Sequence, residues 1–321
     1  MKLKPIVKNS VAKNLDHSLF MDKTLLIDRI KDLTSPIFPK SFKHDTQLSK
    51  LTDIKCVSLD FYGTMFISGV GDIGVDEEQK SASKRYIREA LEQVGFSPAK
   101  KDAAGQKALE QFKRALEQQI AQKRSTEGIE FPEPTIISVW QDVLKALAQM
   151  NIIEGKITEE VSIRVAVEFE FRANNIWPVP ELDAILKDLL THDCKLGIIS
   201  NSQFYTPLAF EALMGETTDA FGFDPDLQKW SYENGVKKPS LQFYSRFTDE
   251  LPAKNLAPEN VLYIGNDLFK DIIPAKKLGM KTGLYVGDRR SVRHEKEDLE
   301  PPKNKPDIII NDLHQIASCL A

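Results

Sequence analysis

The residues best equipped for chemistry follow a short apolar segment. Residues 54–59 have the composition of a buried β-strand, and Asp60 comes directly after them. A carboxylate at the carboxyl end of a parallel strand lies where open α/β sheets bind their ligands. It can attack a substrate and form a covalent aspartyl intermediate. Asp60 is therefore a candidate nucleophile, and Tyr62 stands at the next position that would influence the reaction.

Three further segments are predicted to bring polar residues to the same edge of the sheet. They contain Ser200 and Asn201, then Lys238 before Pro239, then Asn266, Asp267 and Asp271 after a predicted strand at 261–265. Taken singly, each is explained as well by a turn, a helix cap or a surface lysine. Their common position at one sheet edge favours a single site.

The charges of these residues indicate how such a site would work. A nucleophilic carboxylate must stay ionised, and Lys238 is expected to keep the pKa of Asp60 low. Three acids brought together, Asp60, Asp267 and Asp271, would repel one another. Magnesium, which prefers oxygen ligands, would relieve that repulsion. Cationic and hydrogen-bonding groups would also stabilise a phosphoryl group during its transfer.

The elements that must position these residues fall into two blocks. Helical apolar spacing predicts helices at 82–94, 101–123, 137–150 and 158–174. From residue 178 onward strands and helices alternate, with strands predicted at 195–200, 220–223, 261–265, 282–286 and 307–310, and helices at 182–190, 207–214, 240–248, 271–278 and 313–320. Such alternation predicts an α/β fold, a parallel sheet with helices on both faces. The first block is inserted after the first strand, over the carboxyl edge of the sheet.

An amphipathic segment, residues 24–33, precedes the first strand and is closed by Pro36 and Pro39. We expect it to form a helix docked on the core, with a partner-binding arm as the alternative. The rest of the first 50 residues is polar and irregular.

Composition excludes several classes of protein. The chain has 321 residues, of which 41% are hydrophobic and 28% charged, so it is an ordinary globular protein. A net charge of −4 argues against a broad nucleic-acid surface. No segment approaches the roughly 20 apolar residues of a membrane helix. Three widely spaced cysteines and no signal-peptide pattern favour a cytoplasmic location. The oligomeric state stays open.

Four motifs resemble those of the haloacid dehalogenase-like (HAD) hydrolase superfamily, over roughly residues 54–321. They are Asp60-Phe-Tyr-Gly-Thr64, Ser200-Asn201, Lys238-Pro239 and Gly265-Asn-Asp267 with Asp271. The resemblance implies a Rossmann-like, doubly wound parallel sheet with an inserted α-helical cap domain. The expected divisions are an N-terminal extension at 1–50, a core at 51–70 and 178–321, and a cap at 71–177.

The resemblance also implies roles for single residues. Asp60 would be the nucleophile, Ser200 a hydrogen-bond donor to the transferring group, and Lys238 its charge neutraliser. The implied catalytic set is Asp60, Tyr62, Thr64, Ser200, Asn201 and Lys238, and the implied magnesium ligands are Asp60, Tyr62, Asn266, Asp267 and Asp271. The cofactor would be Mg²⁺ and the partner a small-molecule anionic substrate, with no nucleic acid and no membrane.

Tyr62 departs from the pattern of most phosphatases in this superfamily, which carry a second aspartate there to protonate the leaving alcohol. A tyrosine is a poorer acid at neutral pH. The 2-haloacid dehalogenase branch has Tyr-Gly-Thr and Ser-Asn in the same motifs, and a halide needs no proton. Dehalogenases have fewer acids in the fourth motif, whereas this chain keeps Asp267 and Asp271, with Asn266 where many phosphatases have aspartate.

Three functions therefore remain open. The favoured one is magnesium-dependent hydrolysis of a small phosphate ester through an aspartyl-phosphate on Asp60. The alternatives are metal-independent dehalogenation through an aspartyl ester and a non-catalytic binding protein with the HAD fold. Substrate specificity is expected to come from the cap, with Arg172 and Trp177 as candidates for the pocket, although a structural role is the favoured explanation for both.

Overall fold

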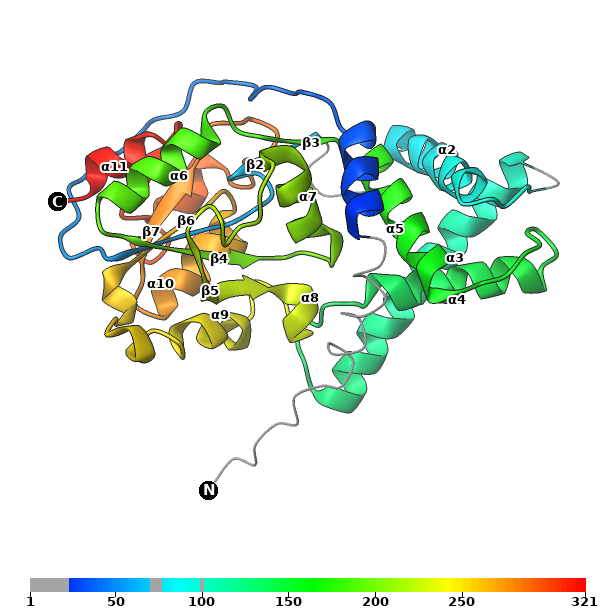
Figure 1. The fold of residues 1–321 in the computed structure, drawn as a ribbon. Helices are drawn as coiled ribbons and strands as arrows, with labels where there is room; N and C mark the ends of the chain where they lie inside the picture. The colour runs from blue at the N-terminus through cyan, green and yellow to red at the C-terminus, as the bar shows by residue number, and fades with distance from the viewer. Residues whose placement is uncertain (1–22, 70–76, 99–100) are drawn as a thin grey trace.

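The computed structural model describes residues 23–69, 77–98 and 101–321 and is built around one six-stranded sheet (Figure 1). Its strands are β5 (Phe223–Trp230), β4 (Lys195–Ser200), β1 (Cys56–Leu59), β6 (Val261–Gly265), β7 (Lys281–Tyr285) and β8 (Ile308–Ile310), in that spatial order. Every neighbouring pair is parallel. The chain runs outward from β1 in one direction and then in the other, so the predicted doubly wound α/β fold is confirmed.

Helices cover both faces of this sheet. On one face lie α6 (Leu182–Thr191) and α11 (Gln315–Cys319), and on the other α9 (Leu241–Thr248) and α10 (Ile273–Lys277) (Figure 1). Strand β1 contributes side chains to the hydrophobic clusters on both faces of the sheet. Cys56 packs in the cluster with α9 and α10, and Val57 and Leu59 pack in the cluster with α6 and α11. A strand buried on both faces carries a continuous apolar run, which is how it was recognised.

Four helices are inserted between β2 (Phe66–Ser68) and β3 (Ile176–Pro178). They are α2 (Glu77–Gln93), α3 (Lys101–Glu127), α4 (Ile136–Gln149) and α5 (Glu159–Ala173), and they pack on one another. Thr158 caps α5, its hydroxyl accepting from Val161 N at 3.2 Å. An antiparallel ribbon of β2 and β3 joins this helical unit to the core. Among the described residues, no helix is long and apolar enough to cross a bilayer.

Two elements differ from the sequence expectations. The strand predicted at 220–223 is wrong, since β5 runs from Phe223 to Trp230. The polar residues of β5 gave no apolar pattern by which to predict it. The strand lies at the edge of the sheet, where Pro225 costs no hydrogen bond between strands. The helix predicted at 271–278 begins earlier, as a π-helical turn over Leu268–Ile272.

Two further helices are α7 (Tyr205–Met214) and α8 (Ser231–Asn234). The expected core–cap boundary at 70/71 lies outside the described residues.

The amphipathic N-terminal segment forms a helix over residues 23–33, drawn in blue in Figure 1 between α5 and α7. Leu26, Ile27 and Ile30 are buried in the main hydrophobic cluster. Arg29 binds Glu168 of α5 in a bidentate pair, with Nε–Oε1 at 2.5 Å and Nη2–Oε2 at 3.0 Å. The helix is therefore docked, as its apolar spacing predicts.

Truncating this docked face should destabilise the protein. Ile30→Ala removes a fully buried side chain and is expected to lower the free energy of unfolding by about 2–4 kcal/mol. Leu25→Ala, on the exposed side of the same helix, should change it by less than about 0.5 kcal/mol. Chemical denaturation of both variants measures the difference, and equal small effects would show that the helix is not packed as described.

Candidate active site

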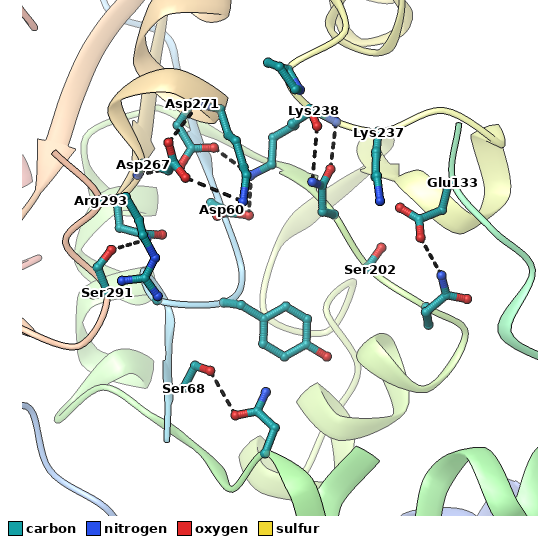
Figure 2. A pocket seen from close by; sticks show the side chains of 18 of the residues that line it. Asp60, Ser68, Glu133, Ser202, Lys237, Lys238, Asp267, Asp271, Ser291 and Arg293 are labelled. Atoms are coloured by element: carbon teal, nitrogen blue, oxygen red, sulfur yellow. Dashed lines mark hydrogen bonds and ion pairs between the residues drawn. The ribbon is translucent and has the colours of Figure 1, made fainter. Parts of the chain in front are cut away.

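A buried lysine between two carboxylates lies at the centre of the site (Figure 2). Lys238 Nζ is 2.7 Å from Asp60 Oδ1 and 2.6 Å from Asp271 Oδ1. Tyr263, on β6, adds its hydroxyl, which is 3.2 Å from Lys238 Nζ and 3.0 Å from Asp271 Oδ1. At most 6% of any of the three charged residues is exposed, so the ion pairs are shielded from solvent. The sheet thus brings together residues 60, 238 and 271.

Burial sets the protonation of Asp60. Removal from water raises the pKa of its carboxyl, Lys238 and the Ser200 hydroxyl lower it, and the nearby charge of Asp271 raises it, so that the pKa is about 6. The expected low pKa of Asp60 is therefore wrong. Lys238 lowers this pKa as expected, but burial raises it by more. Lys238 stays protonated: burial by itself lowers its pKa, but the charges of Asp271 and Asp60 raise it above the usual value.

The side-chain amide of Asn201, directly after strand β4, positions Lys238. Asn201 Oδ1 accepts from Lys238 N at 2.7 Å, and Asn201 Nδ2 donates to Lys238 O at 3.4 Å. The amide thus binds both backbone groups of the lysine and fixes where its side chain starts. Ser200 is fully buried beside Asp60, behind the surface of the cavity.

The motif after β6 is tied to the turn after Asp60. Thr64 Oγ1 donates to Asn266 Oδ1 at 3.2 Å, and Asn266 Nδ2 donates to Ser291 O at 2.8 Å. Gly63 has φ +80°, and a Cβ there would lie 2.9 Å from the Asn266 side chain, so only glycine allows this approach. Thr64 is fully buried and acts on the site through Asn266.

Two of the expected magnesium ligands fit a cation better than the others. Asp271 has no spare oxygen, since Oδ1 contacts Lys238 and Tyr263 and Oδ2 accepts from Asp267 N at 2.9 Å. Asp267 caps its turn with Oδ1 only, and its Oδ2 has Lys270 at 3.7 Å. The described residues contain no cluster of three acidic, histidine or cysteine side chains placed to hold a metal. Asp60 with Asp267 nonetheless supplies the one or two carboxylates that Mg²⁺ typically takes. All five ligands stay a prediction.

Tyr62 lines the cavity beside Asp60 but is engaged elsewhere. Its hydroxyl lies 3.0 Å from Thr206 Oγ1 on α7, and its ring packs edge-on against Phe61. Burial, the charge of Glu170 and the charge of Asp60 all raise the pKa of the phenol, against a smaller lowering by Thr206. Tyr62 is therefore a neutral phenol, and a weaker acid than a solvated tyrosine.

The cavity around Asp60 has a volume of about 560 Å³ and is lined by both units. The core contributes Lys237, Lys270 and Arg293, which sequence reasoning missed, and the inserted helical unit contributes Phe131, Glu133, Glu170 and Asn174. The predicted residues at this surface are Asp60, Tyr62, Asn201, Lys238, Asn266, Asp267 and Asp271. Arg172 and Trp177 do not line it; Arg172 pairs with Glu168 at 2.9 Å.

Glu133 connects the inserted helical unit to the core through hydrogen bonds. Its carboxylate accepts from Ser231 Oγ at 2.8 Å and from Gln203 Nε2 at 2.6 Å, and its backbone N donates to Gly235 O at 3.0 Å. Lys237 N returns a bond to Phe131 O at 3.0 Å. An acid between two prolines, in the break before α4, was the one signal in the sequence for this contact.

The fold and this arrangement place a cluster of acidic, basic and amide side chains at the switch point of a doubly wound sheet. Residues 236–316 match the family model described as HAD-hydrolase-like, and the resemblance to HAD-like hydrolases is confirmed. The matched segment contains Lys238, Asp267 and Asp271. No curated protein matches the sequence.

Solved structures share this fold at low sequence identity. A 2-haloacid dehalogenase from Pseudomonas syringae is 18% identical with a TM-score of 0.50, the match covering 83% of this chain and 97% of that one. A HAD phosphatase from Thermococcus onnurineus is 16% identical with a TM-score of 0.47, again over 83% and 97%. A magnesium-bound HAD-hydrolase from Bacillus subtilis is 16% identical with a TM-score of 0.42, over 84% and 98%.

The raised pKa of Asp60 should appear in the pH dependence of stability. Between pH ~4 and ~6 the unfolded chain ionises this carboxyl while the folded protein keeps it protonated, so wild-type stability falls as pH rises through that window. Asp60→Asn lacks this effect. The difference in unfolding free energy, variant minus wild type, should therefore increase by about 2 kcal/mol from pH 4 to pH 7. Denaturation at several pH values measures it, and a constant difference would contradict the pKa.

Proposed function

We propose that the protein hydrolyses a small phosphate ester through a covalent aspartyl-phosphate on Asp60, with Mg²⁺ as cofactor. The observation that carries the proposal is the cavity around Asp60. Most of the residues that line it have polar or charged side chains, and cations from three segments, Lys237, Lys270 and Arg293, join Lys238. An anionic phosphoryl group suits such a surface, because fixed cations and donors stabilise its charge during transfer.

The first step would form a bond between an Asp60 oxygen and phosphorus and break the bond from phosphorus to the ester oxygen, which would leave as an alkoxide and take a proton from water. Lys238, 2.7 Å from Asp60, would neutralise charge on the phosphoryl oxygens, and Ser200, buried behind the cavity surface, would hydrogen-bond the Asp60 carboxylate. In the second step a water attacks the phosphorus, the bond to Asp60 breaks, and the carboxylate is regenerated with loss of a proton to solvent. A pKa of about 6 leaves Asp60 mostly ionised at neutral pH.

Magnesium would be held by Asp60 and Asp267, and when bound it would offset the negative charge of the acids and of the phosphate. Asp271 contributes differently, because it is committed to Lys238 and keeps that ammonium in place. Asn266 would take part through its position between Thr64 and Ser291 rather than as an extra charge.

The same cavity suits a phosphate ester better than a 2-haloacid, whose carboxylate would meet the cations but whose halogen-bearing carbon would gain nothing from them. A halogen-bearing carbon is apolar, and burying it against carboxylates, amides and ammonium groups leaves those polar groups without partners. The apolar part of the lining comes from Phe131, Pro239 and the rings of Tyr62 and Tyr205, whose hydroxyl groups contact Thr206 and Glu170. We therefore favour phosphoryl transfer over dehalogenation.

Replacing the nucleophile tests the reaction directly. Asp60→Asn should lower kcat for p-nitrophenyl phosphate by about a thousandfold or more, because the amide cannot form the covalent intermediate. Wild-type activity should vanish with EDTA and return with Mg²⁺. The surface variant Asp183→Asn serves as the control and should retain activity. Metal-dependent phosphatase activity that survives in Asp60→Asn would refute the proposal, as would halide release from chloropropionate that EDTA leaves unchanged.

The phenol at position 62 predicts a dependence on the leaving group. A carboxylic acid at this point typically contributes 10²–10⁴-fold by protonating the departing alkoxide. Tyr62 cannot do so, because its pKa is raised. Wild-type kcat for p-nitrophenyl phosphate, whose leaving group needs no proton, should exceed that for glycerol phosphate by at least about tenfold. Tyr62→Phe should change neither by more than about threefold. A large loss confined to glycerol phosphate would show that the phenol is an acid after all.

A further inference from the structure

Arg293 is a cation on the wall of the Asp60 cavity with no carboxylate beside it. Its Nη1 donates to two backbone carbonyls, Arg290 O at 2.6 Å and Val292 O at 3.1 Å. Within the described part of the chain, no acidic side chain lies within 4.0 Å of its guanidinium. Its neighbour Arg290, by contrast, pairs with Asp288 at 2.7 Å. A fixed and unpaired guanidinium facing a cavity is suited to bind an anion.

The loop that carries Arg293 is anchored to the reaction centre. Ser291 is buried, its carbonyl accepts from Asn266 Nδ2 at 2.8 Å, and its hydroxyl donates to Asp288 O at 2.9 Å. Arg289 N also donates to Lys40 O at 2.9 Å. These bonds place Arg293 at a set distance from the motif that contains Asp267. Figure 2 shows Arg293 on the Asp267 side of Asp60, with Lys237 on the other side.

The other cations of the cavity already have acidic neighbours. Lys238 lies between Asp60 and Asp271, and Lys270 is 3.7 Å from Asp267. Lys237 faces Glu133, whose pKa it lowers against the larger effect of burial. Arg293 therefore brings a positive charge that the described residues do not balance.

The size of the cavity leaves room for more than the reacting phosphoryl group. Its volume of about 560 Å³ falls in the range of sites for whole small molecules. We propose that Arg293 binds a second anionic group of the substrate, so that the preferred substrates are phosphate esters carrying a further carboxylate or phosphate. This proposal rests on the phosphatase function proposed above.

A matched series of substrates tests it. Glycerol phosphate has one anionic group, whereas phosphoglycerate adds a carboxylate and glycerol bisphosphate a phosphate to a similar skeleton. Wild-type kcat/KM should be higher for at least one of the latter two, and which one identifies the second group. Arg293→Gln should lower kcat/KM for the preferred compound by about tenfold to a hundredfold, mainly through KM. The loss should be at least tenfold larger than the loss for p-nitrophenyl phosphate.

Two variants separate binding from disturbance of the loop. Arg293→Lys keeps the charge and should recover part of the preference. Arg289→Gln removes an equal charge from an exposed position in the same loop and should leave all the kinetics unchanged. Equal losses for every substrate in Arg293→Gln, or no wild-type preference for a doubly anionic ester, would overturn the proposal.

A binding measurement keeps this result distinct from a failure of the phosphatase function. Calorimetric titration of phosphoglycerate and of glycerol bisphosphate into Asp60→Asn needs no turnover. Adding Arg293→Gln to that background should weaken binding of the preferred compound by about tenfold or more. Arg293-dependent binding without turnover in the wild type would refute the phosphatase alone, and binding that does not depend on Arg293 would refute the second anion site.

Discussion

The ammonium of Lys238, held between the carboxylates of Asp60 and Asp271, is the interaction on which the site depends. Three charges lie out of water here, and each is tolerable only because the others are within hydrogen-bonding distance. The three residues come from the end of β1, a loop before α9 and the turn after β6. Any shift of these elements would leave a buried charge unpaired, so the requirement reaches well beyond the cavity.

Much of the surrounding structure maintains that arrangement. Asn201 binds the backbone of Lys238, Tyr263 bridges its ammonium and Asp271, and Asp271 in turn accepts from Asp267 N. The same network makes Asp271 a partner of the lysine and leaves Asp267 as the more accessible acid. Asp267 and Asp271 look equivalent in the sequence. Their hydrogen bonds make Asp271 a structural acid and leave Asp267 as the proposed metal ligand.

Most of the fold could be predicted from sequence, because continuous apolar runs and helical apolar spacing report burial directly. Strands β4 and β6 were predicted with their observed bounds, and the docked N-terminal helix followed from its amphipathic pattern. Strand β5 was misplaced because an edge strand can carry polar residues and a proline. The ribbon of β2 and β3 was missed since strands of three residues have no detectable period.

The sequence by itself determined the α/β class, the order of the four motifs and the identity of the residues beside Asp60, because these depend on local pattern and on motif order. Tertiary structure alone decided the protonation of Asp60, the commitment of Asp271 to Lys238 and the engagement of Tyr62 with Thr206. It also brought Glu133, Lys237 and Arg293 to one cavity. Burial and charge pairing depend on segments far apart in the chain, and no local pattern carries that information.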